Sequence, residues 1–184
     1  MSGDLALKPA ELLRPLERFL IREVRPIPEV RPIPGHDVPE PYRRLLVGDH
    51  DMTPTLEAYH AEQIHLRVLD RCLENETLSR LVVLITGRTG RAVEFGAIDI
   101  HLRLFPADAR EAVIGCHMPL GSILSRYAVP HLSHPSAFVR VQPLDFIRDA
   151  LCIDADPVML YGRRNALTTP DGDILADILE ILPP

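Results

Sequence analysis

The sequence predicts a single α+β domain, in which short helices pack on an antiparallel sheet of roughly six strands. The chain has 184 residues, enough for one domain with a substantial core, and its 46% hydrophobic and 25% charged residues are typical of a globular protein. Most of the predicted strands are joined by hairpin turns, such as those at residues 87–90 and 169–172. Helical segments do not alternate regularly with strands, which argues against a parallel doubly wound sheet.

The first 42 residues predict a helix followed by a proline-rich strap. Leucines and a phenylalanine recur at roughly helical spacing over residues 5–23, so we expect one helix that ends at Arg22. The sequence VRPIP then occurs at residues 24–28 and 30–34, and its four prolines lack backbone donors, which predicts an extended conformation. The repeat is a candidate PxxP-type ligand, but a stiff strap lying across the domain is the favoured interpretation.

The remaining residues, 43–184, are predicted to form the main domain, with no further domain boundary. Thr53 is a good helix cap and Pro54 suits the first position of a helix, so a helix is expected to begin there and to end near residue 61. Other helices are expected at residues 42–47, 106–115 and 119–129. The expected strands are residues 63–73, 78–87, 91–105, a segment within 136–149, 157–168 and 173–182.

The composition and the motifs exclude several classes of protein. There are 20 basic and 26 acidic residues and the formal net charge is −6, so we expect no nucleic-acid partner and no membrane partner. Cys72, Cys116 and Cys152 are far apart and form no CxxC motif, which argues against disulfides and thiolate zinc sites. No HExxH, GxSxG or phosphate-binding glycine motif occurs, so no metal and no other cofactor is expected. There is no signal peptide and no stretch near the ~18 apolar residues that span a bilayer, so we expect a cytoplasmic protein.

Arg80 is the only charged residue in an expected strand that is otherwise apolar on both faces, residues 78–86. If both faces are covered, Arg80 must meet an anion, because a buried guanidinium without a partner costs several kcal/mol. The alternative is an arginine near the strand end that reaches solvent. The pattern alone leaves both open.

The last expected strand carries acidic residues on both faces. Glu180 shares a face with Ile178 and Leu182, whereas Asp177 shares the other face with Asp173, which marks that face as the wetter one. A carboxyl at Glu180 among aliphatic neighbours would have a raised pKa and would be able to donate a hydrogen bond or a proton. The pattern prefers Glu180 to Asp177 as the inner acid only by a small margin.

A basic pair, Arg163 and Arg164, lies on the expected strand 157–168. Side chains alternate along a strand, so one arginine must point to each face of the sheet. We expect one to be solvated and the other to face the core and pair with a carboxylate.

Five short segments in a fixed order resemble the chorismate pyruvate-lyase family. They are LLVGDHDMTPTLE at residues 45–57, RLVVL at 80–84, MPLGSIL at 118–124, YGRRN at 161–165 and ILEILP at 178–183. The resemblance extends from about residue 43 to the C-terminus, roughly three quarters of the chain, and the N-terminal strap lies outside it. The same fold also occurs in the ligand-sensing domains of some transcription regulators.

The resemblance implies a cofactor-free lyase that converts chorismate to 4-hydroxybenzoate and pyruvate in a pocket closed off from solvent. It implies that Arg80 binds the ring carboxylate, helped by the backbone amide of Met52. It also implies that Glu180 and the backbone of Leu120 meet the ring hydroxyl. On this hypothesis Arg80 and Glu180 are the catalytic residues: Arg80 orients the substrate and Glu180 assists proton transfer.

The expected partner is therefore a small aromatic or cyclohexadiene dicarboxylate, bound by a monomer or a simple homo-oligomer. Arg163 or Arg164 is expected to neutralise its enolpyruvyl carboxylate. Two alternatives remain: a domain of this fold that binds an aromatic acid as effector without turnover, and a lyase of secondary metabolism that acts on a related benzoate precursor. An effector domain would be expected beside a DNA-binding domain, and residues 1–42 contain too many prolines for a winged helix, which favours the enzyme.

Overall fold

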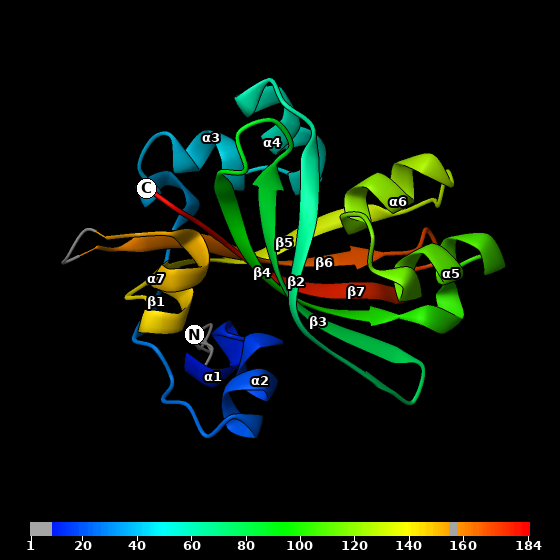
Figure 1. The fold of residues 1–184 in the computed structure, drawn as a ribbon, viewed down its shortest axis with the longest axis horizontal. Coiled ribbons are helices and arrows are strands. Elements are labelled where there is room, and N and C mark those ends of the chain that lie inside the picture. Colours follow the sequence, from blue (N-terminus) through cyan, green and yellow to red (C-terminus); the bar gives the residue numbers. More distant parts are fainter. Residues whose placement is uncertain (1–8, 155–157) are drawn as a thin grey trace, which may run out of the picture.

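A seven-stranded antiparallel sheet runs through the computed structural model, which describes residues 9–154 and 158–184 (Figure 1). The strand order is β1-β5-β6-β7-β4-β3-β2, and each pair of neighbours is antiparallel. The predicted α+β class and antiparallel sheet are confirmed, with one strand more than expected. No helix in these residues is long and apolar enough to cross a membrane.

The elements follow one another along the chain mostly as hairpins and single helices. The strands are β1 (Val30–Ile33), β2 (Ile64–Glu74), β3 (Thr77–Thr86), β4 (Ala92–His101), β5 (Leu132–Val141), β6 (Leu160–Thr168) and β7 (Ile174–Leu182). The α-helices are α1 (Pro9–Leu12), α2 (Leu16–Arg22), α3 (Tyr42–Leu46), α4 (Met52–His60), α5 (Ala107–Gly115), α6 (Leu120–Arg126) and α7 (Asp145–Leu151), with short 3-10 turns η1 (Gly35–Asp37) and η2 (Leu102–Leu104).

The additional strand comes from the proline-rich strap. The second VRPIP copy forms β1, which pairs with β5 at the edge of the sheet. An edge strand tolerates Pro32 because only one side of the strand takes part in the ladder. Val30 is buried, so the strap is attached to the core as well as to the sheet edge.

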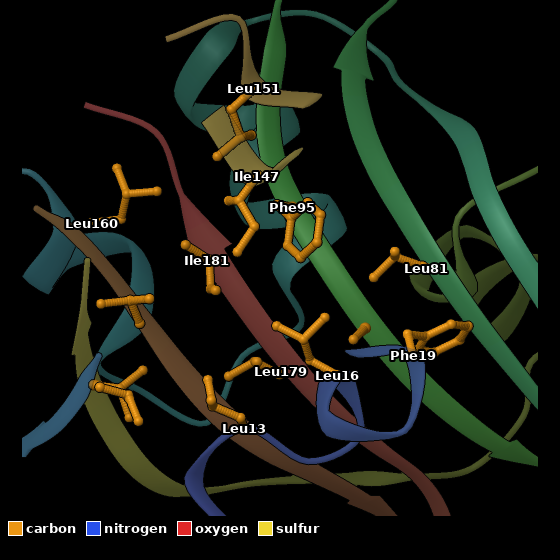
Figure 2. Packing of buried hydrophobic residues seen from close by; sticks show 14 of the residues in the cluster. Leu13, Leu16, Phe19, Leu81, Phe95, Ile147, Leu151, Leu160, Leu179 and Ile181 are labelled. Atoms are coloured by element: carbon orange, nitrogen blue, oxygen red, sulfur yellow. The ribbon is translucent and has the colours of Figure 1, made fainter. Parts of the chain in front are cut away.

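One face of the sheet is covered by α1, α2 and α7, and Figure 2 shows the packing there. The N-terminal helices bury their leucines and Phe19 against alternate residues of the central strands. The contributing side chains in Figure 2 include Leu13, Leu16, Phe19, Leu81, Phe95, Ile147, Leu151, Leu179 and Ile181. Residues 9–22 are therefore part of the main core and not an appendage to it.

The opposite face carries two smaller apolar clusters. One lies under α5 and α6, and the other lies under α3 and α4. The sheet face also carries buried polar side chains, among them Arg80, Glu94, Arg163, Asn165 and Glu180. The candidate site lies on this face.

Several elements differ from those predicted, and the one helix expected up to Arg22 is divided into α1 and α2. A helix, α7, occupies the end of the segment in which only a strand was expected, and β5 begins before that segment. Helix α4 begins at Met52 and not after Thr53. The N-cap is Asp51, which has the extended backbone conformation typical of that position. The strand expected at residues 157–168 begins at Leu160 in the structure, and Pro157 lies outside the described residues.

Leu16→Ala should lower the free energy of unfolding by about 2–5 kcal/mol, because Leu16 is 0% exposed in the main core. Ile21→Ala on the same helix is the matched control. Ile21 is 67% exposed, so its truncation should change stability by no more than about 0.5 kcal/mol. Denaturant unfolding measures both, and equal effects would show that the N-terminal helices do not belong to the folded core.

Candidate functional site

A cavity lies between the first turns of α4 and α6 and the face of the sheet opposite to α1, α2 and α7. Its floor is built by β3, β4, β7 and β6, and Leu66 of β2 closes one side. Most of the lining is aliphatic. Charged and polar side chains lie among it, including Arg80 on β3, Glu94 on β4 and Glu180 on β7. This combination of apolar walls with a few polar groups is typical of a small-molecule site.

The cavity is small. The volume open to the centre of a water molecule is about 60 Å³. That is room for about four to six waters, or roughly 120–180 Å³ of liquid. A single six-membered ring with one or two small substituents is of this size, whereas chorismate, with its additional enolpyruvyl group, is larger.

The roof is formed where the N-termini of α4 and α6 meet. Met52 and Leu120, the two residues whose backbone was predicted to contact a ligand, are the first residues of these helices and both line the cavity. Gly121 makes the close approach possible, since a Cβ there would lie 2.8 Å from Thr53 Oγ1. The structure therefore brings Met52 and Leu120 to the same cavity as Arg80 and Glu180.

Asp51, which also lines the cavity, is held by His131. The His131 ring lies 2.8 Å from Asp51 Oδ2 through Nε2 and 2.8 Å from the Val129 carbonyl through Nδ1. Burial lowers the pKa of His131, but the hydrogen bonds to Val129 and Asp51 and the charge of Asp51 outweigh it, so the pKa is raised. Because Asp51 is engaged with His131, its side chain makes no capping bond to α4.

Arg80 is buried without a partner for much of its guanidinium. It is 1% exposed, and its Nε and Nη1 have no hydrogen-bond partner among the described residues. Burial lowers the pKa of Arg80, and interaction with the Cys116 thiol opposes this only in part. The alternative of a strand-end arginine that reaches solvent is wrong. A desolvated cation facing a cavity is a site for an anion.

Glu180 faces the cavity but is not the isolated acid that the sequence suggested. It lies directly opposite Arg163 on β6, and Arg163 Nε donates to its carboxylate. Both side chains are buried. The sequence analysis did not pair them because they are 17 positions apart and meet only through the β6–β7 register.

Arg163 is fully occupied by protein groups. Besides Glu180, its Nη1 donates to the carbonyls of Leu46 and Gly48, each at 3.1 Å, and its Nη2 donates to the carbonyl of His50 at 2.9 Å. Arg163 therefore lies on the cavity face of the sheet but is not free to bind a ligand carboxylate.

Arg164 and Asp177 lie on the opposite face of the sheet. Arg164 pairs with Asp177 and donates to the backbone carbonyl of Glu11 at 3.0 Å. Neither residue lines the cavity. The structure thus separates Arg164 from the other predicted site residues.

Glu94 and Asn165, on the floor of the cavity, are polar residues that were not identified as site residues from the sequence. Glu94 is the only charged residue in the buried stretch 92–98, the same signal that singled out Arg80. Asn165 bonds Ser133 on β5, with its Nδ2 lying 3.0 Å from the Ser133 hydroxyl. Asn165 stands in a strand with other polar residues, so its pattern gives no comparable signal.

No family model and no curated protein matches the chain. Several solved structures share its fold. The effector domain of PhnF from Mycobacterium smegmatis aligns over 74% of this chain and 90% of that domain, with a TM-score of 0.54 and 11% identity. A longer PhnF structure aligns over the same share of this chain with a TM-score of 0.52 and 10% identity. YydK from Bacillus subtilis, a possible transcriptional regulator, aligns over 65% of this chain with a TM-score of 0.51 and 9% identity.

This chain spans only 64% of that longer PhnF chain and 58% of YydK. At such low identity the likeness establishes the fold, which is consistent with the predicted chorismate lyase-like architecture.

The prediction of a lyase is contradicted by these comparisons. The structures named above are PhnF, its effector domain and a possible transcriptional regulator, and none of them is a lyase. The same finding contradicts the expectation of no connection to nucleic acid. The N-terminal elements α1, α2 and β1 are built into the core and the sheet.

Arg163→Met should lower the free energy of unfolding by about 3–5 kcal/mol, because it leaves a buried Glu180 charge and three carbonyls without their donor. Arg31→Met is the control. Arg31 is exposed and pairs with Glu29 at the surface, so about 0–1 kcal/mol is expected. A loss no larger than the control's would mean that Arg163 does not hold the roof to the sheet.

Glu94→Gln should stabilise the protein increasingly as pH rises. Burial, followed by the negative charge of Glu180, raises the pKa of Glu94 well above 4.5. Its neutral form therefore contributes stability that is fully present below about pH 4.5 and is lost as pH rises through the folded-state pKa. Unfolding free energies of wild type and variant should coincide near pH 4.5 and diverge above it, whereas exposed Glu29→Gln should show no such divergence. A pH-independent difference would show that Glu94 ionises normally.

Proposed function

We propose that the chain is the ligand-binding domain of a transcription regulator and that it binds a small aromatic or cyclic carboxylic acid without turning it over. The observation that carries the proposal is Arg80, which lines a mostly apolar cavity and has a buried guanidinium whose Nε and Nη1 have no hydrogen-bond partner among the described residues. A carboxylate accepts two parallel hydrogen bonds from such a group. Binding would supply the anion that the protein itself does not.

The remaining lining supports a flat, mostly apolar ligand. Val82, Ile98 and Leu167 are among the aliphatic side chains that line the cavity. Gly96 on the floor keeps this space open, because a Cβ there would lie 3.1 Å from Val82 Cγ2. The backbone amides of Met52 and Leu120, at the starts of their helices, are proposed as further donors to the ligand.

Two features favour binding over turnover. The volume open to the centre of a water molecule, about 60 Å³, is nearer to the size of a substituted ring than to that of chorismate. Glu180, the expected proton-transfer residue, is held by Arg163 on the floor of the site. The regulators that share the fold support a role in which ligand occupancy is passed to a DNA-binding partner.

Arg80→Met should raise the thermal midpoint of the ligand-free protein and weaken binding of 4-hydroxybenzoate by about 30-fold or more. The stability gain is expected because the change removes an unpaired buried cation, and the affinity loss because it removes the carboxylate clamp. Thermal unfolding and calorimetric titration measure the two effects.

This opposite movement of stability and affinity distinguishes a ligand-binding arginine from a structural one. A variant that is destabilised and binds 4-hydroxybenzoate like the wild type would overturn the proposal. So would release of pyruvate when the wild-type protein is incubated with chorismate, because that would make the site catalytic.

A further inference from the structure

Glu94 is a buried acid of the cavity to which the protein offers no partner at one oxygen. It is 4% exposed, and its Oε2 has no hydrogen-bond partner among the described residues. It lies opposite Leu84 on β3, four positions along that strand from Arg80. The backbone positions of Glu94 and Arg80 therefore lie about 13 Å apart along the strand direction, toward opposite ends of the cavity floor.

The guanidinium beside Glu94 is already bound to another carboxylate. Gly96 pairs with Glu180 in the β4–β7 register, so Glu94 and Glu180 are diagonal neighbours on one sheet face and within reach of each other. Arg163 donates to Glu180 and to three backbone carbonyls. Two buried carboxyls thus share one cation, an arrangement in which only one of them ionises readily.

The direction of the Glu94 pKa agrees with this geometry. Burial and the charge of Glu180 raise it well above its usual value, and Arg163 lowers it only in part. The other charged side chains that line the cavity are Arg80 at the far end and Asp51 on the roof, which is paired with His131.

We propose that Glu94 is a neutral carboxylic acid that donates a hydrogen bond to the ligand, so that the cavity selects monocarboxylates carrying a neutral acceptor at the end remote from Arg80. This inference rests on the proposed function and specifies the ligand class of the same site. Buried neutral acids are used as hydrogen-bond donors in other binding pockets.

The charges in the cavity favour such a ligand. With Glu94 neutral, Glu180 is paired with Arg163 and Asp51 with His131, so the positive charge of Arg80 remains without an acidic partner in the cavity. One ligand carboxylate neutralises it. A second carboxylate at the other end would face the charge of Glu180, whereas a carbonyl, ether or hydroxyl oxygen would accept the Glu94 proton without that repulsion.

The selectivity is tested by calorimetric titration with three acids of similar shape: benzoate, 4-formylbenzoate and terephthalate. The formyl oxygen is an acceptor and not a donor, so the wild type should bind 4-formylbenzoate roughly three- to tenfold tighter than benzoate. Terephthalate should bind more weakly than 4-formylbenzoate. Glu94→Gln, which retains a neutral donor, should keep the preference for 4-formylbenzoate within about threefold, and Glu94→Leu should abolish it.

If Glu94 is ionised, it cannot donate to the formyl oxygen, and the wild type would bind 4-formylbenzoate no better than benzoate. That result, or a preference unaffected by Glu94→Leu, overturns the assignment.

A ligand-free measurement separates this inference from the proposed function. The infrared difference spectrum of wild type minus Glu94→Gln near neutral pH should contain the C=O stretching band of a protonated carboxylic acid. If the band is present but none of the three acids binds, the proposed function fails and the neutral state of Glu94 stands. If the acids bind and the band is absent, the role of Glu94 is wrong and the proposed function stands.

Discussion

The buried guanidinium of Arg163 connects the parts of the molecule that enclose the cavity. Its Nε is bound to Glu180 on the neighbouring strand, and its Nη atoms bind the carbonyls of Leu46, Gly48 and His50. These carbonyls belong to the end of α3 and the loop that leads into α4. One side chain thereby joins the floor of the site to the segment that positions its roof. A lysine could not replace Arg163, because its compact ammonium lacks the planar, forked arrangement of donors by which a guanidinium binds several partners at once.

Arg163 and Arg80 differ in how far the protein satisfies their hydrogen-bond donors. Both are almost fully buried on the same face of the sheet. Arg163 makes four hydrogen bonds to the protein, whereas two nitrogens of Arg80 have none among the described residues. A group that destabilises the ligand-free fold is retained where binding uses it. Because Arg163 is bonded to Glu180, Glu94 has no cation of its own, and its pKa is raised. The interaction that holds the roof therefore also affects the protonation of Glu94.

Much of the fold follows from local pattern. Alternation and turn residues located β3, β4, β6 and β7 to within a few residues, and the VRPIP repeat was recognised as extended. The strap's role as an edge strand could not be predicted, because it depends on pairing with β5, more than 100 residues away. Helix α7 was missed because it is a single short segment between two strands, with its apolar residues facing the same core as theirs.

Residues of the candidate site could be predicted only where a charged residue occurs in an otherwise apolar strand. Arg80 and Glu180 stand out as charges in apolar strands, and both line the cavity. The partner of Glu180 could not be identified from the sequence, because Arg163 meets Glu180 through strand register and not through sequence spacing. Glu94 carried the same signal as Arg80 but received no weight, since the segment around it lies outside the motifs of the resemblance. The family resemblance identified the fold correctly but suggested chemistry that the regulators of the same fold do not support.

A crystal structure of the protein soaked with 4-hydroxybenzoate tests the central claim most directly. The account predicts a ligand in the cavity whose carboxylate accepts hydrogen bonds from Nε and Nη1 of Arg80, the two nitrogens that lack partners in the protein. A cavity that holds only water at saturating ligand, with Arg80 turned onto a protein carboxylate, would contradict it.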